Sequence, residues 1–511
     1  MNKIINSLLL LVFAFSMSAK AQNYNRPVTD QIFPYEFQIM DSTTSFYYAL
    51  GPFKLYSTPS DPDYLRPKAL ILDPKGYTVW YGFMTGSVIM MDFKYDSGSD
   101  QFSSVNRIGG TSGIALIDTN FTVQEEFTNV SSDYLDGHDF KRLSDGNFAL
   151  LGVSDSLFDL SAYTFNGSPG SASTICRCNT VEIVDISNNL IWDWNSCNYL
   201  HPSEGYDHYG YNISSYDYAH INSVFEDDDG HLILSFRHMN SVVKISRTTG
   251  NVIWRLGGKL NDFTFTNDVG FTGQHNAERR PSGRISVFDN GQMSGPPEFS
   301  RGLEYVIDTS TWSATLVDDF QYSPTTFGSA LGSNYRLDGS KVINYGMLYR
   351  PEPSFVVVDS LNQVQATAYF PDSVMNYRVQ PFHPGFEFDR PTVTCLDSAG
   401  TTFLVAEPGH SVYLWSSGEN TQIIEPLVDS VYQVWVPQGF GKISCPPIHY
   451  SATYCAPTEI AEHNRRPARL IKTIDLLGRE IKHKSIGQLY IEVYSDGSIK
   501  KIVSLQQFEG Q

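Results

Sequence analysis

Three histidines stand at matching places in the sequence, each eight to ten residues ahead of a glycine-containing turn: His138, His220 and His275. An unprotonated imidazole is a competent nucleophile, exchanges protons near neutral pH and binds transition metals. A lone histidine near a strand end is more often a structural residue. The shared spacing instead predicts equivalent positions in three repeats of the fold, where the three side chains would act together.

Arg237 follows a short apolar run, 234–236, which is expected to pair in a hairpin with the strand that His220 begins. Because a hairpin brings those two ends together, Arg237 should lie beside His220. One guanidinium and three imidazoles would then form a cationic pocket in an acidic protein. Such a pocket suits an anionic group with tetrahedral oxygens.

Three histidines also suit zinc or iron as ligands. No carboxylate shares their spacing and Arg237 would repel a cation, so neither a metal nor another cofactor is predicted. Phe271, Tyr209 and Tyr218 are expected to pack in the core or in loops, with stacking on an aromatic ligand as the alternative. The histidines without this spacing are interpreted as surface or loop residues: His201, His208, His231, His238, His410 and His449.

Residues 26–390 contain a loose repeat of two β-hairpins. Five copies are clear, and residues 31–57 with a strand near Tyr377 would complete a sixth. Radial repetition of four-stranded sheets is a β-propeller, and an array of β-sandwiches is the alternative. The second hairpin of each copy opens at 114–117, 183–186, 243–245, 305–307 or 355–358. The first hairpin turns at Lys75-Gly76, Asp145-Gly146, Asp229-Gly230, Ser282-Gly283 or Asp338-Gly339.

The composition agrees with an all-β fold. Aromatic residues are 14% of the 511-residue chain, and 39 glycines and 26 prolines supply turns. The net charge of -19 argues against nucleic acid and anionic lipid as partners. In a propeller the first strand of each sheet lies beside the central channel, so histidines from three successive sheets would meet at the axis.

Residues 1–21 have the pattern of a secretory signal peptide. Lys3 supplies the positive charge, residues 8–15 form an unbroken apolar run, and Ala19-Lys20-Ala21 is typical of a cleavage site. A buried N-terminal strand is the alternative. No later stretch reaches the ~18–20 apolar residues of a membrane helix, so we predict a secreted or cell-surface protein without a membrane span.

After residue 390 the sequence changes character. Residues 391–455 are interpreted as a small Ig-like β-sandwich with strands at 412–415 and 431–436. Cys395 and Cys445 would clip this domain. Cys176, Cys178 and Cys197 lack a fourth ligand in zinc spacing, so a structural disulfide is expected among them.

The end of the chain, residues 462–511, combines Arg465, Arg466 and Arg469 with the run 471–480 and with two later strands. This arrangement resembles the C-terminal sorting domain of the type IX secretion system in Bacteroidetes. The resemblance implies a β-rich export address, recognised by that machinery after passage through the periplasm. An ordinary terminal β-domain is the alternative.

Six short motifs follow one another between about residues 100 and 380. Taken singly each is weak, but their order is specific, and the set resembles the bacterial arylsulfotransferase family. The motifs are His138-Asp139-Phe140-Lys141-Arg142-Leu143, His220-Ile221-Asn222-Ser223-Val224, Leu234-Ser235-Phe236-Arg237-His238, Gly250-Asn251-Val252-Ile253-Trp254-Arg255-Leu256-Gly257-Gly258, Gln274-His275 and Phe288-Asp289-Asn290-Gly291.

The resemblance implies a six-bladed propeller over residues 22–390 and a sulfotransferase that uses no nucleotide donor. An aryl sulfate ester would give its sulfuryl group to a histidine, and a phenolic acceptor would then take it, with ping-pong kinetics. By motif position the site residues are His275 as the sulfated nucleophile, His138, His220 and Arg237 as its catalytic companions, and Asn222 and Gln274 as substrate-binding residues.

Two other functions stay open. A surface propeller for adhesion or glycan binding would need none of these side chains. A metal- or quinone-dependent oxidoreductase would hold its cofactor among them. Some arylsulfotransferases carry a disulfide close to the active centre, whereas no cysteine here lies between residues 197 and 395, so the same redox control is not expected.

Overall fold

A computed structural model gives the structure of the chain. It describes residues 22–451 except 27, 41–43, 55–65, 67, 83–86, 109–110, 166, 207–208, 210, 213, 293–297, 349–351, 372 and 399, and then 470–475, 479–481, 489–494 and 499–503. In this part of the chain the regular elements are β-strands and a few 3-10 turns, which confirms the all-β prediction. None of the described segments is a helix long and apolar enough to span a membrane. The predicted signal peptide, residues 1–21, lies outside the described residues.

Six sheets, each with a core of four antiparallel strands, make up most of residues 47–382, and four of them carry further strands. Within each sheet the strands are hydrogen-bonded in the order written. Three sheets are β6 (Ser87–Asp96), β7 (Gln101–Ile108), β8 (Thr111–Ile117) and β9 (Val123–Phe127); β10 (Tyr134–Arg142), β11 (Phe148–Phe158), β14 (Thr174–Val184) and β15 (Leu190–Asn195); and β17 (Ile221–Glu226), β18 (Leu232–Phe236), β19 (Ser241–Ile245) and β20 (Val252–Gly257). The others are β22 (His275–Arg279), β23 (Ile285–Asp289), β24 (Arg301–Asp308) and β25 (Ser313–Phe320); β26 (Ser333–Leu337), β27 (Ser340–Asn344), β28 (Phe355–Val358) and β29 (Val364–Tyr369); and β30 (Val374–Phe382), β3 (Tyr47–Lys54), β4 (Ala69–Leu72) and β5 (Thr78–Gly82).

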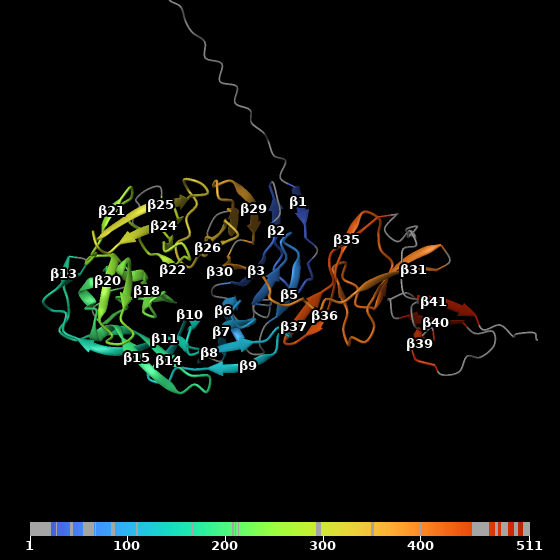
Figure 1. The fold of residues 1–511 in the computed structure, drawn as a ribbon, viewed down its shortest axis with the longest axis horizontal. Coiled ribbons are helices and arrows are strands. Elements are labelled where there is room, and N and C mark those ends of the chain that lie inside the picture. The colour runs from blue at the N-terminus through green and yellow to red at the C-terminus, as the bar shows by residue number, and fades with distance from the viewer. Residues whose placement is uncertain are drawn as a thin grey trace, which may run out of the picture. The chain divides into compact units, whose positions relative to one another are not determined.

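The first strand of each sheet contacts the first strands of the two neighbouring sheets. These contacts run from β6 through β10, β17, β22, β26 and β30 and back to β6, so the sheets surround a common centre (Figure 1). The fold is therefore propeller-like, with the first strands innermost. Because both faces of each sheet are covered, a strand such as β18 is buried along its whole length and has an almost continuous apolar sequence.

Apolar clusters between adjacent sheets hold the ring together. Leu151 and Val181 of one sheet pack in the same cluster as Leu234 and Val243 of the next, and all four side chains are fully buried. Burial of one such side chain contributes about 1.5–3 kcal/mol. The inner strands are consequently held in fixed positions relative to one another.

The sheet that closes the ring joins distant parts of the chain. β30, which contains Tyr377, pairs with β3, and β3 pairs with β4. This is the pairing expected between residues 31–57 and the strand near Tyr377. One detail of the prediction was wrong: the turn at Lys75-Gly76 joins the third and fourth strands of its sheet, because the first strand comes from the far end of the domain.

The segment after residue 390 continues that sheet. β37 (Gly441–Ser444) pairs with β5, and β36 (Val434–Gln438) lies beyond it. The predicted single strand at 431–436 is wrong, because the chain changes sheet at Gln433 between β35 (Ser430–Tyr432) and β36. The buried Gln433 amide donates hydrogen bonds to Thr78 O, Ser444 Oγ and Cys445 O.

Residues 455–511 form a second compact unit, separate from residues 1–454. Its described strands are β39 (Leu470–Ile474), β40 (Leu489–Tyr494) and β41 (Ile499–Val503), which make a three-stranded antiparallel sheet. Arg465, Arg466 and Arg469 lie outside the described residues.

The cysteines agree with the predictions in one domain and not in the other. Cys178 and Cys197 form a disulfide, while Cys176 is a buried free thiol whose pKa is raised to about 12 by burial. The predicted bond between Cys395 and Cys445 is wrong, since Cys445 is free and buried. Cys445 Sγ instead accepts a hydrogen bond from Val434 N inside the sheet.

The Cys178–Cys197 disulfide closes a loop of 19 residues. Replacing both cysteines with serine should lower the free energy of unfolding by about 3 kcal/mol, because the unfolded chain regains the entropy of the open loop. Chemical denaturation of the wild type and the double variant measures the difference. Because Cys395 is also disulfide-bonded, a reducing agent acts on both proteins, but it should remove the difference in stability between them. Equal stabilities under oxidising conditions would contradict the prediction.

Candidate active site

The three histidines come from the inner ends of three successive sheets. His138 lies within β10, His220 immediately precedes β17, and His275 is the first residue of β22. The ring centroids of His138 and His220 are 4.9 Å apart. His275 is close enough to both for their charges to affect its pKa.

The same backbone irregularity occurs at each of these positions. Pairing shifts register between Leu135 and Phe140, between Ile221 and Ser223, and at the start of β22. Bulges of this kind redirect side chains and are common beside active sites. His220 also has a φ of 55°, a left-handed conformation that costs a non-glycine residue free energy unless its surroundings hold it. Arg237 N donates to His220 O and helps to hold it.

His275 is held in one tautomer by Asn290. The Asn290 amide nitrogen donates to Gly328 O and Leu331 O, so the amide oxygen faces His275 Nδ1 at 2.7 Å. Gly273 O also lies 3.1 Å from Nδ1. Since both neighbours are acceptors, Nδ1 carries the proton and Nε2 keeps a lone pair. Leu331 N donates to that lone pair at 3.2 Å.

The imidazole of His275 is neutral at physiological pH. Its side chain is 2% exposed, and burial together with the nearby Arg237 charge holds its pKa well below 6.5. A buried neutral imidazole with one fixed lone pair has the properties of a nucleophile.

His138 and His220 each have a carboxylate behind them. His138 Nδ1 hydrogen-bonds to Asp136 Oδ1, and His220 Nδ1 lies 2.7 Å from Asp217 Oδ2. Burial lowers the pKa of His138, but the charge and hydrogen bond of Asp136 outweigh burial and raise it above 6.5. Burial raises the pKa of Asp217, and its interactions with His220 lower it to a net value below the usual range. His138 and His220 are therefore suited to proton transfer.

His238 was predicted to be a surface or loop residue, and this is wrong. Its side chain is buried and stacks between His220 and Tyr209, with ring centroids 4.3 and 4.9 Å away. Its Nδ1 lies 2.6 Å from Asp217 O, and its Nε2 lies 2.8 Å from Arg237 Nη1. His238 thus donates to the carbonyl and accepts from the guanidinium. Burial and then His220 lower its pKa to about 3, so it stays neutral.

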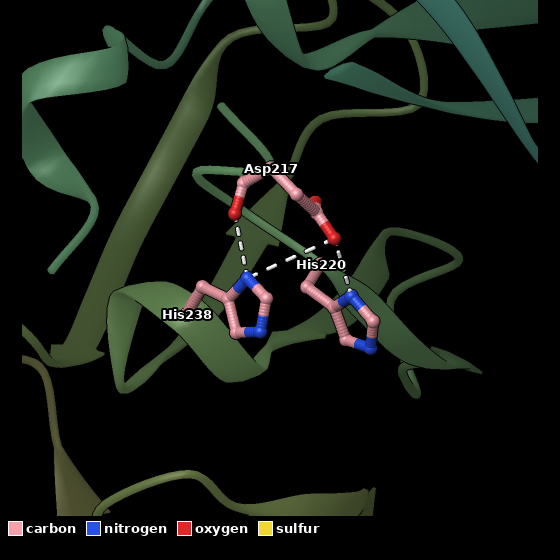
Figure 2. Close-up of side chains that lie close together, drawn as sticks. All are labelled: Asp217, His220 and His238. Carbon is pink, nitrogen blue, oxygen red and sulfur yellow. Dashed lines mark hydrogen bonds and ion pairs between the residues drawn. The ribbon is translucent and has the colours of Figure 1, made fainter. Parts of the chain in front are cut away.

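Figure 2 shows how Asp217 serves two histidines. Its carboxylate faces His220 Nδ1, and its carbonyl oxygen faces His238 Nδ1. These three residues also have the composition of a metal site. The sequence prediction concerned carboxylates with the spacing of the histidines and not a carboxylate such as Asp217, which lies three residues before His220. Both nitrogens of His238 are nevertheless already in hydrogen bonds, with Nδ1 as donor, so the arrangement suits a hydrogen-bonded network better than a metal ion.

Arg237 begins the 3-10 turn η5 (Arg237–Met239) directly after β18. It is partly buried, and desolvation lowers its pKa. Nη2 donates to Ser329 O at 3.3 Å, and Nε has no partner among the described residues. No carboxylate in the described part of the chain is within ion-pair distance of the guanidinium. An anion would satisfy this charge.

A pocket of about 470 Å³ opens at this guanidinium. Tyr209 is in its wall and lies under the Arg237 guanidinium carbon, 5.2 Å from it. Phe271 and Tyr218, by contrast, are buried in apolar clusters. The lining residues are Tyr209, Arg237, His238, Gln292, Glu298, Phe327 and Ser329.

Asn222 and Gln274 lie deeper and connect the sheets. Asn222 Nδ2 donates to Gln274 O at 2.7 Å, while Gln274 Nε2 donates to Ser235 Oγ, Phe236 O and Ser241 O. Both side chains are fully buried. Their amide hydrogen bonds hold the loop before His275 in place. Their side-chain oxygens have no partner within the described residues.

Sequence reasoning missed Asn290, His238, Asp136 and Asp217. Asp136 and Asp217 precede their histidines by two and three residues, which is a usable signal. Asn290 lies in a quoted motif, but its contact with His275 depends on how β22 and β23 pair.

A comparison with protein families found a match in this region. The arylsulfotransferase (ASST) family model matches residues 104–346. The match contains the three predicted histidines and Arg237, and it supports an arylsulfotransferase-type function for these residues. The same family implies an aryl sulfate donor and a phenolic acceptor. No curated protein matches the sequence.

Solved structures similar to this chain share little sequence with it. An inactive variant of virginiamycin B lyase from Staphylococcus aureus is 9% identical over 73% of this chain and 96% of its own, with a TM-score of 0.35. AztD from Citrobacter koseri is 6% identical over 67% and 100%, with a TM-score of 0.33. The Dos1 propeller is 13% identical over 83% of each chain, with a TM-score of 0.26. Scores this low carry no argument about function.

The Asn290 contact generates a pH prediction. In Asn290→Asp a carboxylate would face His275 Nδ1, stabilise the imidazolium and raise the pKa of His275. The protonated histidine cannot attack, so turnover of an aryl sulfate should fall as the pH drops below neutral, by about tenfold at about pH 6 relative to its plateau. The wild type, whose His275 pKa is well below 6.5, should show no such limb. Asn290→Ala is the uncharged control, and an acid limb shared by both variants would contradict the prediction.

The His238–Arg237 hydrogen bond generates a second prediction. His238→Ala should lower kcat/KM by about tenfold or more, because Arg237 loses the acceptor that holds it. In an Arg237→Ala background the same change should have little further effect. His231→Ala, at the other end of β18, is the matched control and should leave kcat/KM unchanged. Equal losses in the two backgrounds would show that His238 acts independently of Arg237.

Proposed function

We propose that this protein is an aryl-sulfate sulfotransferase that transfers a sulfuryl group through a sulfated His275. The observation that carries the proposal is the pairing of a neutral imidazole, whose Nε2 lone pair is fixed by Asn290, with a partly buried guanidinium that has no carboxylate partner in the described residues. A nucleophile beside an unsatisfied cation suits attack on an anionic sulfate ester.

The first half-reaction forms the His275 Nε2–sulfur bond and breaks the bond between sulfur and the phenolic oxygen. Attack replaces the hydrogen bond that Nε2 accepts from Leu331 N. Negative charge grows on the sulfuryl oxygens and the leaving oxygen, where Arg237 and the imidazoles stabilise it. His138, whose raised pKa keeps a larger fraction protonated, gives its proton to the departing phenolate.

The second half-reaction is the reverse with a different phenol. His138, now deprotonated, takes the acceptor's proton as the phenolic oxygen attacks sulfur and Nε2 leaves. His220, with its partner Asp217, lies beside His138. It either helps His138 to transfer the phenolic proton or orients the sulfuryl oxygens. Tyr209 and Phe327 in the pocket wall offer aromatic faces for the phenolic rings of donor and acceptor.

The same proposal includes the setting of the enzyme. The six sheets are six blades of the propeller, residues 1–21 direct export, and residues 391–455 are an Ig-like accessory domain. Residues 462–511 are a type IX sorting domain, which makes the protein secreted or cell-surface after passage through the periplasm. The alternative function is a non-catalytic surface propeller for adhesion or glycan binding.

Incubation with 4-nitrophenyl sulfate and phenol tests the activity. The wild type should release 4-nitrophenolate and form phenyl sulfate, and His275→Ala should reduce the rate by about a thousandfold or more because it removes the attacking atom. His449→Ala, an exposed histidine on β38 (Ile448–Tyr450), is the control and should keep full activity. Without acceptor, the wild type should gain the mass of one sulfuryl group on the peptide that contains His275. Release unaffected by His275→Ala would reject the mechanism.

A further inference from the structure

His138 and His220 each have a carboxylate partner, whereas Arg237 has none among the described residues. Asp136 stands behind His138 and Asp217 behind His220, each joined to its imidazole by a hydrogen bond. Each pair is neutral when its imidazole is protonated and carries one negative charge when it is not. The two pairs therefore add no positive charge to the pocket, although the residue types suggest that they would.

The charges of a buried cluster that is hydrogen-bonded to Asn222 also cancel. Arg378 Nη1 lies 2.9 Å from Asp92 and 3.0 Å from Asp139, and Lys94 binds the same two carboxylates. Two cations and two anions form this buried cluster. Arg378 Nη2 also donates to Asn222 O, which connects the cluster to the site.

The remaining ionisable groups near the pocket add no positive charge. His275 and His238 have lowered pKa values and are neutral. Glu298, at the exposed edge of the pocket, adds negative charge. Among the residues that line the pocket, Arg237 carries the positive charge, and no described carboxylate lies within ion-pair distance of it. One unpaired guanidinium suits one negative charge on a ligand.

We propose that Asp136 and Asp217 are specificity-determining residues that restrict the pocket to monoanionic tetrahedral groups. They admit a sulfate monoester and discriminate against a phosphate monoester, which has the same shape but carries two charges above its second pKa of about 6. The inference rests on the proposed function, because it assumes that this pocket binds the reacting ester. At a fixed protonation state of the imidazole, replacing either aspartate by asparagine makes the pair one unit more positive.

Binding of two unreactive probes tests the proposal. Benzenesulfonate and phenylphosphonate have the same ring and the same three-oxygen head, but at about pH 8.5 the phosphonate has lost both protons and carries a second charge. Calorimetry on the wild type should show benzenesulfonate binding at least about tenfold more tightly. Lowering the pH to about 5.5 should bring the two affinities together, since the phosphonate then gains a proton.

Asparagine variants test whether the two carboxylates cause the preference for the monoanion. Asp136→Asn and Asp217→Asn should each narrow the ratio of the two affinities by about tenfold at about pH 8.5. Asp397→Asn, which removes an exposed carboxylate on β31 (Val393–Ser398), is the control for net charge and should leave the ratio unchanged.

Three outcomes overturn the proposal in distinguishable ways. If the wild type binds both probes equally at about pH 8.5, the pocket does not select charge, although the proposed function stands. The same follows if the wild type selects but the ratio is unchanged in both asparagine variants. If neither probe binds to the wild type, the anion pocket itself is absent and the proposed function fails with it. The wild-type measurement needs no folded variant.

Discussion

The partly buried guanidinium of Arg237 is the group on which the site depends. Removing an ion from water without an opposite charge costs free energy. Among the described residues, its hydrogen-bond acceptors are the neutral atoms His238 Nε2 and Ser329 O. Neutral acceptors hold the side chain in place without cancelling its charge. The guanidinium therefore remains available for an ion pair with an anionic ligand. In this way a protein with a net charge of -19 can keep a local cationic site.

The three histidines have equivalent positions in the repeat, but they differ in the atom that forms a hydrogen bond with Nδ1. An amide oxygen faces His275 and carboxylates face His138 and His220. An amide fixes the tautomer and favours the charged imidazole less than a carboxylate does, because the amide carries no charge. The repeat supplies equivalent positions, and the residue beside each Nδ1 distinguishes the proposed nucleophile from the proposed proton-transfer groups.

Local signals in the sequence predicted much of the fold. Asp145-Gly146, Asp229-Gly230 and Ser282-Gly283 set hairpins because their glycines adopt the positive φ that the turns need, near 80° in each case. The histidines follow from the same register, since each lies near the start of the strand before such a turn.

Other features depend on contacts between distant segments and left no local signal. His238 follows Arg237 in the chain, and its importance arises from the 3-10 turn that directs it against His220 and Asp217. Gln433 breaks an apparently continuous strand because its amide is needed between two sheets. Cys445 stays reduced for a similar reason, since its sulfur lies inside a sheet, where Val434 N donates to it.

The strand that closes the ring also contributes charged residues near the site. β30, which pairs with β3 across more than 300 residues of chain, contributes Tyr377 and Arg378. Both side chains donate to Asn222 O on β17, and Arg378 binds Asp139 on β10. Without this strand, Lys94 would be the one cation among the described residues paired with both Asp92 and Asp139. Closure of the ring therefore balances the charge of the cluster that is hydrogen-bonded to Asn222, so strands from both ends of the domain contribute to the surroundings of the proposed site.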